Sequence, residues 1–275
     1  MSENRLFSTS VLKTIAMVLM VIDHLTAFLY QAYALSPRYS LPYATLGEDP
    51  FYSLGRALGR PAFILFAFLI ACGMQYSRNR YRYILRLALM ALISEIPFDL
   101  VRSNEFMDMS YQNVFFTLVL GAVGILAIEL LKKYRLLAVL SCAGCVSAAF
   151  FLKTDYGGAG VLLIIVFYLL KNNLLMAVLV SMAAFFGSHG ILDMANAAIT
   201  GKFSIRTAGF AEILRKTWEY IESYASREMY AVAGFLIVYC YNGRKGRQLS
   251  KTFYYLVYPV HLILIYIVRK YVMML

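Results

Sequence analysis

The sequence predicts an all-α protein, a polytopic bundle of about nine or ten transmembrane helices. Of the 275 residues, 61% are hydrophobic and only 15% are charged. Soluble domains are about 45–50% apolar and about 25% charged, so this composition is typical of an integral membrane protein. Several apolar stretches also approach the roughly 20 residues that a helix needs to cross the hydrocarbon core of a bilayer.

Nine apolar runs are the predicted spans, in chain order. They are 11–35, 58–77, 81–101, 113–131, 136–152, 158–171, 173–188, 229–242 and 252–273. The loops between these runs alternate in their content of Lys and Arg. The basic loops are 78–82, 132–135, 171 and 244–251, and the loops on the opposite side are 36–57, 102–112 and 153–157. The positive-inside rule then predicts a multi-pass protein of the cell inner or plasma membrane with a cytoplasmic N-terminus.

The first span carries ionisable side chains at bilayer depth, where such groups usually mark a functional site. Eleven residues advance about 16 Å along a helix and return to within about 20° of the starting face. Lys13 and His24 therefore lie on one stripe, with Met17 and Met20 between them. This stripe suits a long ligand with an anionic head outside the bilayer, and the alternative is a packing histidine bonded to a backbone carbonyl. Asp23 points about 100° away, so we expect it to meet another neighbour or to reach His24 by side-chain bending.

Arginines open the second and third spans. Arg60, at the start of the second span, is a candidate to hold an acidic group, to stabilise a developing oxyanion or to snorkel to the interface. Arg78, Arg82 and Arg86 are spaced by four residues, so they form a guanidinium column on one helix face. Arginine binds phosphate through a planar fork. The arginine column therefore indicates either a phosphate-bearing ligand or anchoring to lipid headgroups.

Two further positions combine ionisable groups with a proline. Glu95 and Asp99 share a helix face around Pro97, which removes one backbone hydrogen bond. These carboxylates are candidates to line a polar cavity or to form an ion pair with Arg60. His261, in the last span, also follows a proline. We expect it either to make a structural hydrogen bond to a backbone carbonyl or to take part in the site.

The remaining features exclude other classes of protein. The net charge of +11 is concentrated in short loop clusters, which are topology signals, so no nucleic-acid partner is predicted. Cys142 and Cys145 lie among small residues, which favours helix packing over redox or metal chemistry, and no metal site is predicted. Segment 189–228 has an amphipathic pattern, which predicts a helix at the membrane interface or a tenth span. No repeat or linker divides residues 1–275, so we expect a single domain.

A set of short motifs runs in order over nearly the whole chain. They are Lys13-Thr-Ile-Ala-Met17 with Ile22-Asp-His24, Gly59-Arg60-Pro-Ala-Phe63, Ser94-Glu-Ile-Pro-Phe-Asp99, Gln112-Asn113-Val-Phe-Phe-Thr117, Asp155-Tyr-Gly157, Tyr241-Asn-Gly243 and Tyr258-Pro259-Val-His261. These motifs resemble the TraX family, which is named for a protein that N-acetylates pilin in conjugative plasmid systems. Segment 189–228 matches none of the family motifs.

The resemblance implies a chemistry for the first span. TraX proteins are similar to the transmembrane acyltransferases of acyltransferase family 3, in which an Arg lies eleven residues before a His. Lys13 stands at the Arg position here and keeps the charge without the fork. The resemblance implies acetyl-CoA as the acyl donor and His24 as the catalytic base. From its place beside His24, Asp23 is expected to orient or charge the imidazole ring. The CoA nucleotide is then expected at the cytoplasmic mouth, against Lys13 and the arginine column.

The sequence is compatible with three functions. The first is transfer of an acetyl group to an amine or hydroxyl of a protein, glycan or lipid acceptor, reached from the extracytoplasmic side. The second is a transporter or flippase of an anionic solute or lipid, which would also use a buried histidine, carboxylates and a basic mouth. The absence of visible internal repeats disfavours it. The third is a non-catalytic scaffold, which would leave His24 without a purpose.

Overall fold

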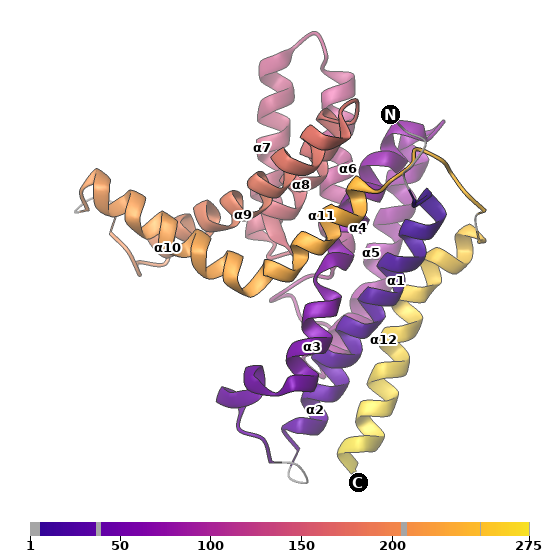
Figure 1. Cartoon of the computed structure of the whole chain (residues 1–275), viewed down its shortest axis with the longest axis vertical. Coiled ribbons are helices and arrows are strands. Elements are labelled where there is room, and N and C mark those ends of the chain that lie inside the picture. Colours follow the sequence, from indigo (N-terminus) through magenta and orange to yellow (C-terminus); the bar gives the residue numbers. More distant parts are fainter. Residues whose placement is uncertain (1–5, 37–39, 205–207, 248, 275) are drawn as a thin grey trace. The chain divides into compact units, whose positions relative to one another are not determined.

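The computed structural model describes residues 6–36, 40–204, 208–247 and 249–274, and over these residues it confirms the all-α prediction. Within them, the only pairing of β type is an isolated bridge between Phe7 and Tyr241. The α-helices (Figure 1) are α1 (Thr9–His24), α2 (Gln31–Ala34), α3 (Pro50–Gly59), α4 (Pro61–Tyr76), α5 (Arg80–Arg102), α6 (Val114–Leu130), α7 (Arg135–Phe151), α8 (Gly157–Leu169), α9 (Leu174–Ile199), α10 (Phe210–Glu228), α11 (Val232–Tyr239) and α12 (Lys251–Met274). Other helical turns are the π-helical η1 (Leu25–Tyr30) and the 3₁₀ turns η2 (Tyr43–Glu48) and η3 (Met229–Ala231).

The chain forms two compact units, each built from segments that alternate along the sequence. The first unit comprises Met1–Leu69, Ala88–Asn113 and Tyr230–Leu275. The second comprises Ile70–Leu87 and Val114–Met229. Because α4 and α5 each contribute to both units, the division does not coincide with a linker in the sequence.

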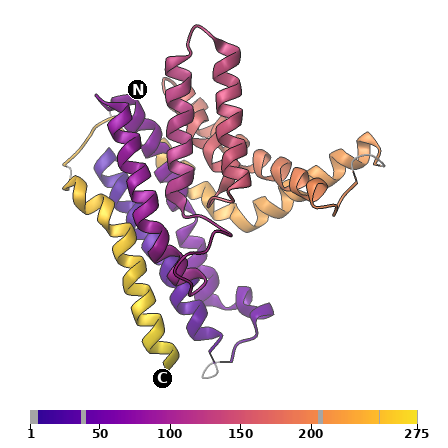
Figure 2. The same ribbon diagram turned by 180° about the vertical axis from the view of Figure 1, so that it is seen from behind.

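In the first unit, α1, η1 and α2 follow one another as a single apolar rod from Thr9 to Ala34. Ser8 caps the start of the rod, because its side chain accepts a hydrogen bond from the N–H of Val11. Helix α12 lies along the rod (Figures 1 and 2), and α3 packs against α1 and η1. The end of α1 is therefore enclosed by α3 and α12.

In the second unit, α8 packs against α6, α7 and α9, and α10 packs against α9. Helix α9 continues to Ile199, well beyond the predicted end of this span at residue 188. Residues 189–199 are mostly small or apolar and contain no proline, so nothing in them interrupts the helix. Helix α10 carries the amphipathic part of segment 189–228, with Glu219 paired to Arg215 and Lys216. Its position at a membrane interface stays a prediction.

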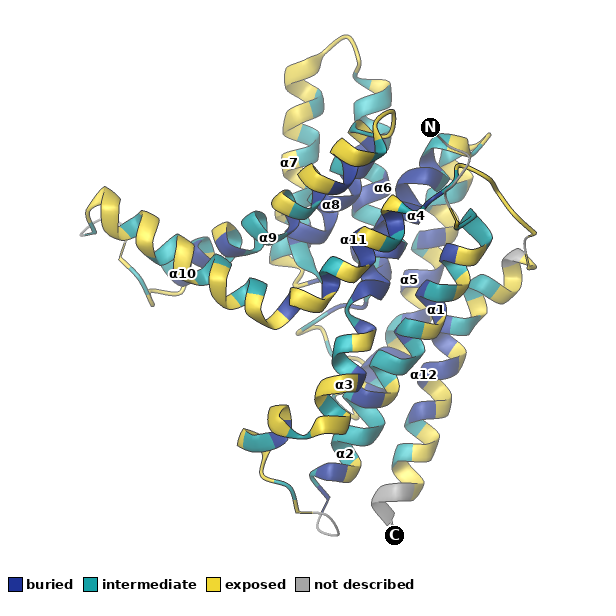
Figure 3. Cartoon of the chain, viewed as in Figure 1, coloured by how far each residue is buried: buried dark blue, intermediate teal, exposed yellow. Residues whose placement is uncertain are grey.

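Several helices have the length and surface of membrane spans. Over the described residues, four segments are long and apolar enough to cross a bilayer, namely Thr9–Ala34, Pro50–Tyr76, Leu174–Ile199 and Thr252–Tyr271. Helices α6, α7 and α8 are apolar but shorter, so the total of nine or ten spans stays a prediction. Helix α7 exposes Leu136, Val139 and Leu140, as a helix that faces lipid would, whereas α4 is largely buried (Figure 3). These features indicate a membrane protein.

Candidate functional site

The backbone changes its hydrogen-bonding pattern directly after His24, in the first unit. Helix α1 ends at this residue, and the six residues Leu25–Tyr30 form the π-helical turn η1. Such turns are rare and often occur at functional sites, because they widen the helix and redirect its side chains. The buried Thr26 donates its hydroxyl hydrogen to the carbonyl of Ile22, at 2.9 Å. No residue pattern in the sequence signalled this turn.

His24 forms a hydrogen-bonded pair with His261 of α12. The Nδ1 atom of His24 lies 2.7 Å from Nε2 of His261, and Nδ1 of His261 lies 2.7 Å from the carbonyl oxygen of Val257. A carbonyl only accepts, so Nδ1 of His261 donates to it and its Nε2 accepts from Nδ1–H of His24. This order leaves the Nε2 of His24 with a lone pair, as a general base requires. His261 does bond a backbone carbonyl, but it is that of Val257 and not the carbonyl of Tyr255 that Pro259 frees.

Aromatic rings surround the histidine pair. The two imidazole rings are nearly parallel, at 8°, with centroids 5.0 Å apart. Phe28 and Tyr258 lie against His24, with centroid separations of 5.6 and 5.7 Å. Tyr258 also meets the edge of His261. Because these rings restrict the orientation of both imidazoles, the hydrogen bond between them is held in a defined geometry.

Asp23 has a different partner, as its direction on the helix predicted. One carboxylate oxygen lies 2.7 Å from a guanidinium nitrogen of Arg56 in α3, and Arg60 adds a second positive charge nearby. Helix α3 approaches closely because Gly55 and Gly59 face α1 and η1. A Cβ atom at Gly59 would lie 2.6 Å from Cγ of Asp23. The signal in the sequence was the Gly-x-x-x-Gly spacing of these residues, a known close-packing pattern of membrane helices.

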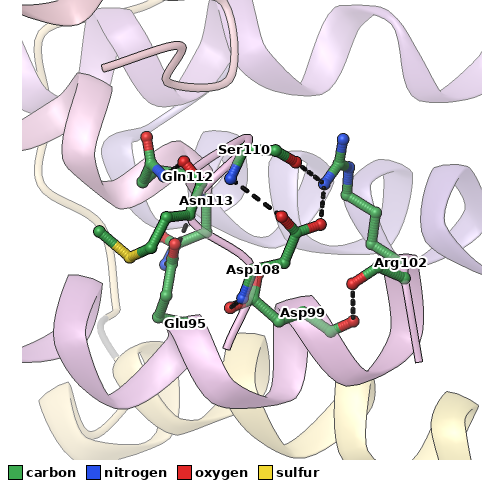
Figure 4. Close-up of polar contacts among 9 residues, drawn as sticks. Glu95, Asp99, Arg102, Asp108, Ser110, Gln112 and Asn113 are labelled. Carbon is green, nitrogen blue, oxygen red and sulfur yellow. Dashed lines mark hydrogen bonds and ion pairs between the residues drawn. The ribbon is translucent and has the colours of Figure 1, made fainter. Parts of the chain in front are cut away.

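Glu95 and Asp99 hold the loop 103–113 to α5 (Figure 4). The N–H of Asn113 donates to Glu95 at 3.2 Å, and its side-chain amide donates to both Glu95 and the carbonyl of Ala91. The N–H of Asp108 donates to Asp99 at 2.8 Å. These bonds give the two carboxylates a role that differs from the pairing with Arg60 expected from the sequence. The buried Asn113 was not predicted as a site residue.

The loop 103–113 is also held by its own ion pair. Arg102 lies 2.9 Å from Asp108, and its guanidinium group covers the ring of Tyr111. Hydrogen bonds from the side chain and the N–H of Ser110 keep the pKa of Asp108 below its ordinary value. Tyr111 stacks on Phe98, and Phe98 contacts Phe28 beside His24. The loop therefore supports the aromatic wall of the histidine pair.

The predicted basic residues fall in different units. Lys13 is half-buried in the first unit, with its Nζ 4.9 Å from the ring centroid of Tyr254 in α12. Arg78, Arg82 and Arg86 are exposed and belong to the second unit. Helix α5 begins at Arg80, so Arg78 precedes it, and only Arg82 and Arg86 of the predicted column lie on one helix face. The structure thus brings Asp23, His24, Arg60, Glu95, Asp99, His261 and Lys13 into one unit, and the arginine column into the other.

The fold and the site together define a helical membrane protein. His24 and the Asp23 carboxylate lie in one candidate span, Thr9–Ala34, and the Arg56 guanidinium that pairs with Asp23 lies in another, Pro50–Tyr76. The family model described as TraX protein matches residues 8–269. The chain therefore belongs to the TraX family. No curated protein and no solved structure matches the chain.

Proposed function

We propose that the protein is a membrane-embedded acyltransferase that moves an acetyl group from acetyl-CoA to an amine or hydroxyl of an acceptor. The observation that carries this proposal is the relay from His24 through His261 to the Val257 carbonyl, which leaves Nε2 of His24 as a base. Membership of the TraX family, whose name is associated with pilin acetylation, supports the same chemistry. The acceptor class, whether protein, glycan or lipid, is left open.

The proposed reaction has two proton transfers at one atom. The acceptor nitrogen or oxygen attacks the thioester carbonyl carbon, and its proton moves to Nε2 of His24. The new C–N or C–O bond forms, the C–S bond breaks, and the CoA thiolate takes the proton back from His24. His261 keeps accepting from Nδ1–H throughout, so it stabilises the imidazolium that forms between the two transfers.

The ion pair beside His24 positions the base. Asp23 is the residue before His24, and its bond to Arg56 ties the end of α1 to α3. Arg56 and Arg60 both interact electrostatically with Asp23, the residue before His24, so their positive charges are candidates to stabilise the oxyanion of the tetrahedral intermediate. In this proposal Asp23 acts through the helix rather than through a bond to the imidazole.

The donor is proposed to lie along α1. Lys13 and His24 are about 16 Å apart along the helix axis, which is the reach of an extended pantetheine arm. Met17 and Met20, both buried, lie between them on the same stripe. We propose that the CoA nucleotide binds at the Lys13 end on the cytoplasmic side, and that the acceptor arrives from the other side. The N-terminus is then cytoplasmic.

Isotopically labelled acetyl-CoA and purified full-length protein test the proposal. Wild type should bind acetyl-CoA and hydrolyse its thioester slowly without an acceptor. His24→Ala should lower hydrolysis by about 10²- to 10⁴-fold while binding is retained. An undiminished rate in a folded His24→Ala protein would refute the role of His24. No binding of acetyl-CoA to wild type would instead favour transport of an anionic solute.

His261 has its own pair of variants. Glutamine carries both an acceptor and a donor, so it is able to accept from His24 and to donate to Val257, whereas alanine does neither. His261→Gln should therefore retain more activity than His261→Ala at equal folding. If the two variants are equally impaired, His261 is a packing residue and the relay is not used.

A further inference from the structure

The loop that follows α11 is attached to the start of α1. The N–H of Thr9 donates to the carbonyl of Arg244 at 2.9 Å, and the N–H of Ser10 donates to the carbonyl of Lys245 at 3.1 Å. The hydroxyl of Ser10 donates to the carbonyl of Arg247. The N–H groups of Thr9 and Ser10 belong to the first helical turn, where no hydrogen bond within the helix satisfies them. The loop is thus held by its backbone, and the helix end itself has no N–H left at these positions for an anion.

The side chains of this loop form a cluster of positive charge. Its carbonyls face α1, and Arg244, Lys245 and Arg247 are exposed. Gly246 adopts a positive φ of 68° and packs against Ser8, which permits the tight turn between the basic residues. Ser10, which binds the loop, precedes Lys13 by one helical turn, about 4.5 Å along the axis. Three exposed loop cations therefore accompany Lys13 at one end of α1, within a single unit.

We infer that Arg244, Lys245 and Arg247, together with Lys13, bind the phosphate groups of the donor nucleotide. This inference rests on the proposed function, because it names the part of the protein that holds the CoA head. A CoA nucleotide carries a diphosphate and a separate phosphate. The four positively charged side chains near the start of α1 complement that negative charge. The two arginines supply forks that bind phosphate oxygens in pairs.

The inference changes the role expected of the arginine column. Lys13 and the basic loop are joined through the first turns of α1, whereas Arg82 and Arg86 belong to the second unit. Arg86 Nε also donates to the carbonyl of Arg82, so part of its fork is used within α5. In this assignment the column anchors the protein at lipid headgroups, and the loop selects the donor.

Matched double variants of the full-length protein test the assignment by calorimetry with acetyl-CoA in neutral detergent. Arg244→Gln/Arg247→Gln keeps the backbone bonds of the loop and removes two charges, and Arg82→Gln/Arg86→Gln removes two charges from the column. The loop pair should raise Kd roughly tenfold or more, about 1.4 kcal/mol, and the effect should shrink at high salt. The column pair should leave Kd within about twofold, which is under about 0.5 kcal/mol. Equal effects of the two pairs would overturn the assignment.

Further arms separate the remaining outcomes. The nucleotide fragment of CoA, without its pantetheine arm, should compete with acetyl-CoA in wild type and lose affinity in the loop variant. If the variant Arg244→Gln/Arg247→Gln binds nanodiscs of anionic phospholipid more weakly but keeps its affinity for acetyl-CoA, the loop is a lipid site. The inference is then wrong, while the proposed function still stands. Failure of wild type to bind acetyl-CoA overturns the proposed function as well. The single variant Arg247→Gln carries the same test if the double variant does not fold.

Discussion

The substitution Gly59→Ala tests whether close contact between α1 and α3 positions the site. The added Cβ would lie 2.6 Å from Cγ of Asp23, which is 0.8 Å less than the 3.4 Å at which ordinary contact begins, and it would lie closer still to Cβ and Oδ1 of Asp23. The obstructing Cβ and carboxylate of Asp23 are short and attached directly to α1, so they have little freedom to move aside. The helices must therefore separate by at least this distance. The 2.7 Å bond between Arg56 and Asp23 would lengthen to at least about 3.5 Å, the outer limit of a hydrogen bond.

The expected cost follows from opposing effects. Overpacking a buried contact typically costs about 1–3 kcal/mol. Replacing a helical glycine with alanine raises the free energy of unfolding by up to about 1 kcal/mol through helix propensity. We expect a net loss of about 1–2 kcal/mol in the free energy of unfolding. Because Asp23 is adjacent to His24, a shift of this size should also lower the rate of acyl transfer by more than about tenfold.

Gly144→Ala is the matched control. Gly144 is also helical, in α7, and a Cβ built there has no neighbour within 4 Å. Thermal unfolding in detergent and the rate of acetyl-CoA hydrolysis are measured for both variants. The control should match or slightly exceed wild type in stability and keep its rate. Equal stability and equal rates for Gly59→Ala and Gly144→Ala would refute the close-packing argument.

Three other predictions concern the ion pair, the loop and the topology. Arg56→Gln should cost about 2–3 kcal/mol because the mostly buried Asp23 carboxylate loses its hydrogen-bonded counter-charge and keeps only the more indirect charge of Arg60. Asp23→Asn in the same chain should recover much of that loss, and additive costs in a double-mutant cycle would contradict the coupling. Asn113→Ala removes the side-chain donor to Glu95 and should lower the free energy of unfolding by about 2–3 kcal/mol. Proteolysis within residues 103–113 should become faster, and an unchanged rate would mean that other contacts hold the loop. A cysteine at Leu249 should react with an impermeant thiol reagent only after the membrane is opened, and labelling in intact cells would reverse the proposed orientation.

The sequence by itself determined the class of structure and one half of the site. Long apolar runs leave the chain no stable alternative in lipid to helices, so composition alone predicted the all-α fold. Helical periodicity placed Lys13 and His24 on one stripe and turned Asp23 toward another neighbour, because side-chain direction along a single helix depends only on residue spacing. Short motifs were sufficient to reveal the family.

Only the tertiary structure decided which groups meet. His24 and His261 are 237 positions apart, and periodicity specifies a helix face but not the residue that will lie against it. The same holds for Arg56 beside Asp23, whose 2.7 Å contact depends on how closely two glycines let α3 approach. The π-helical turn after His24 and the attachment of the basic loop to α1 are likewise products of packing, because each exchanges local hydrogen bonds for contacts that form only once the helices are assembled.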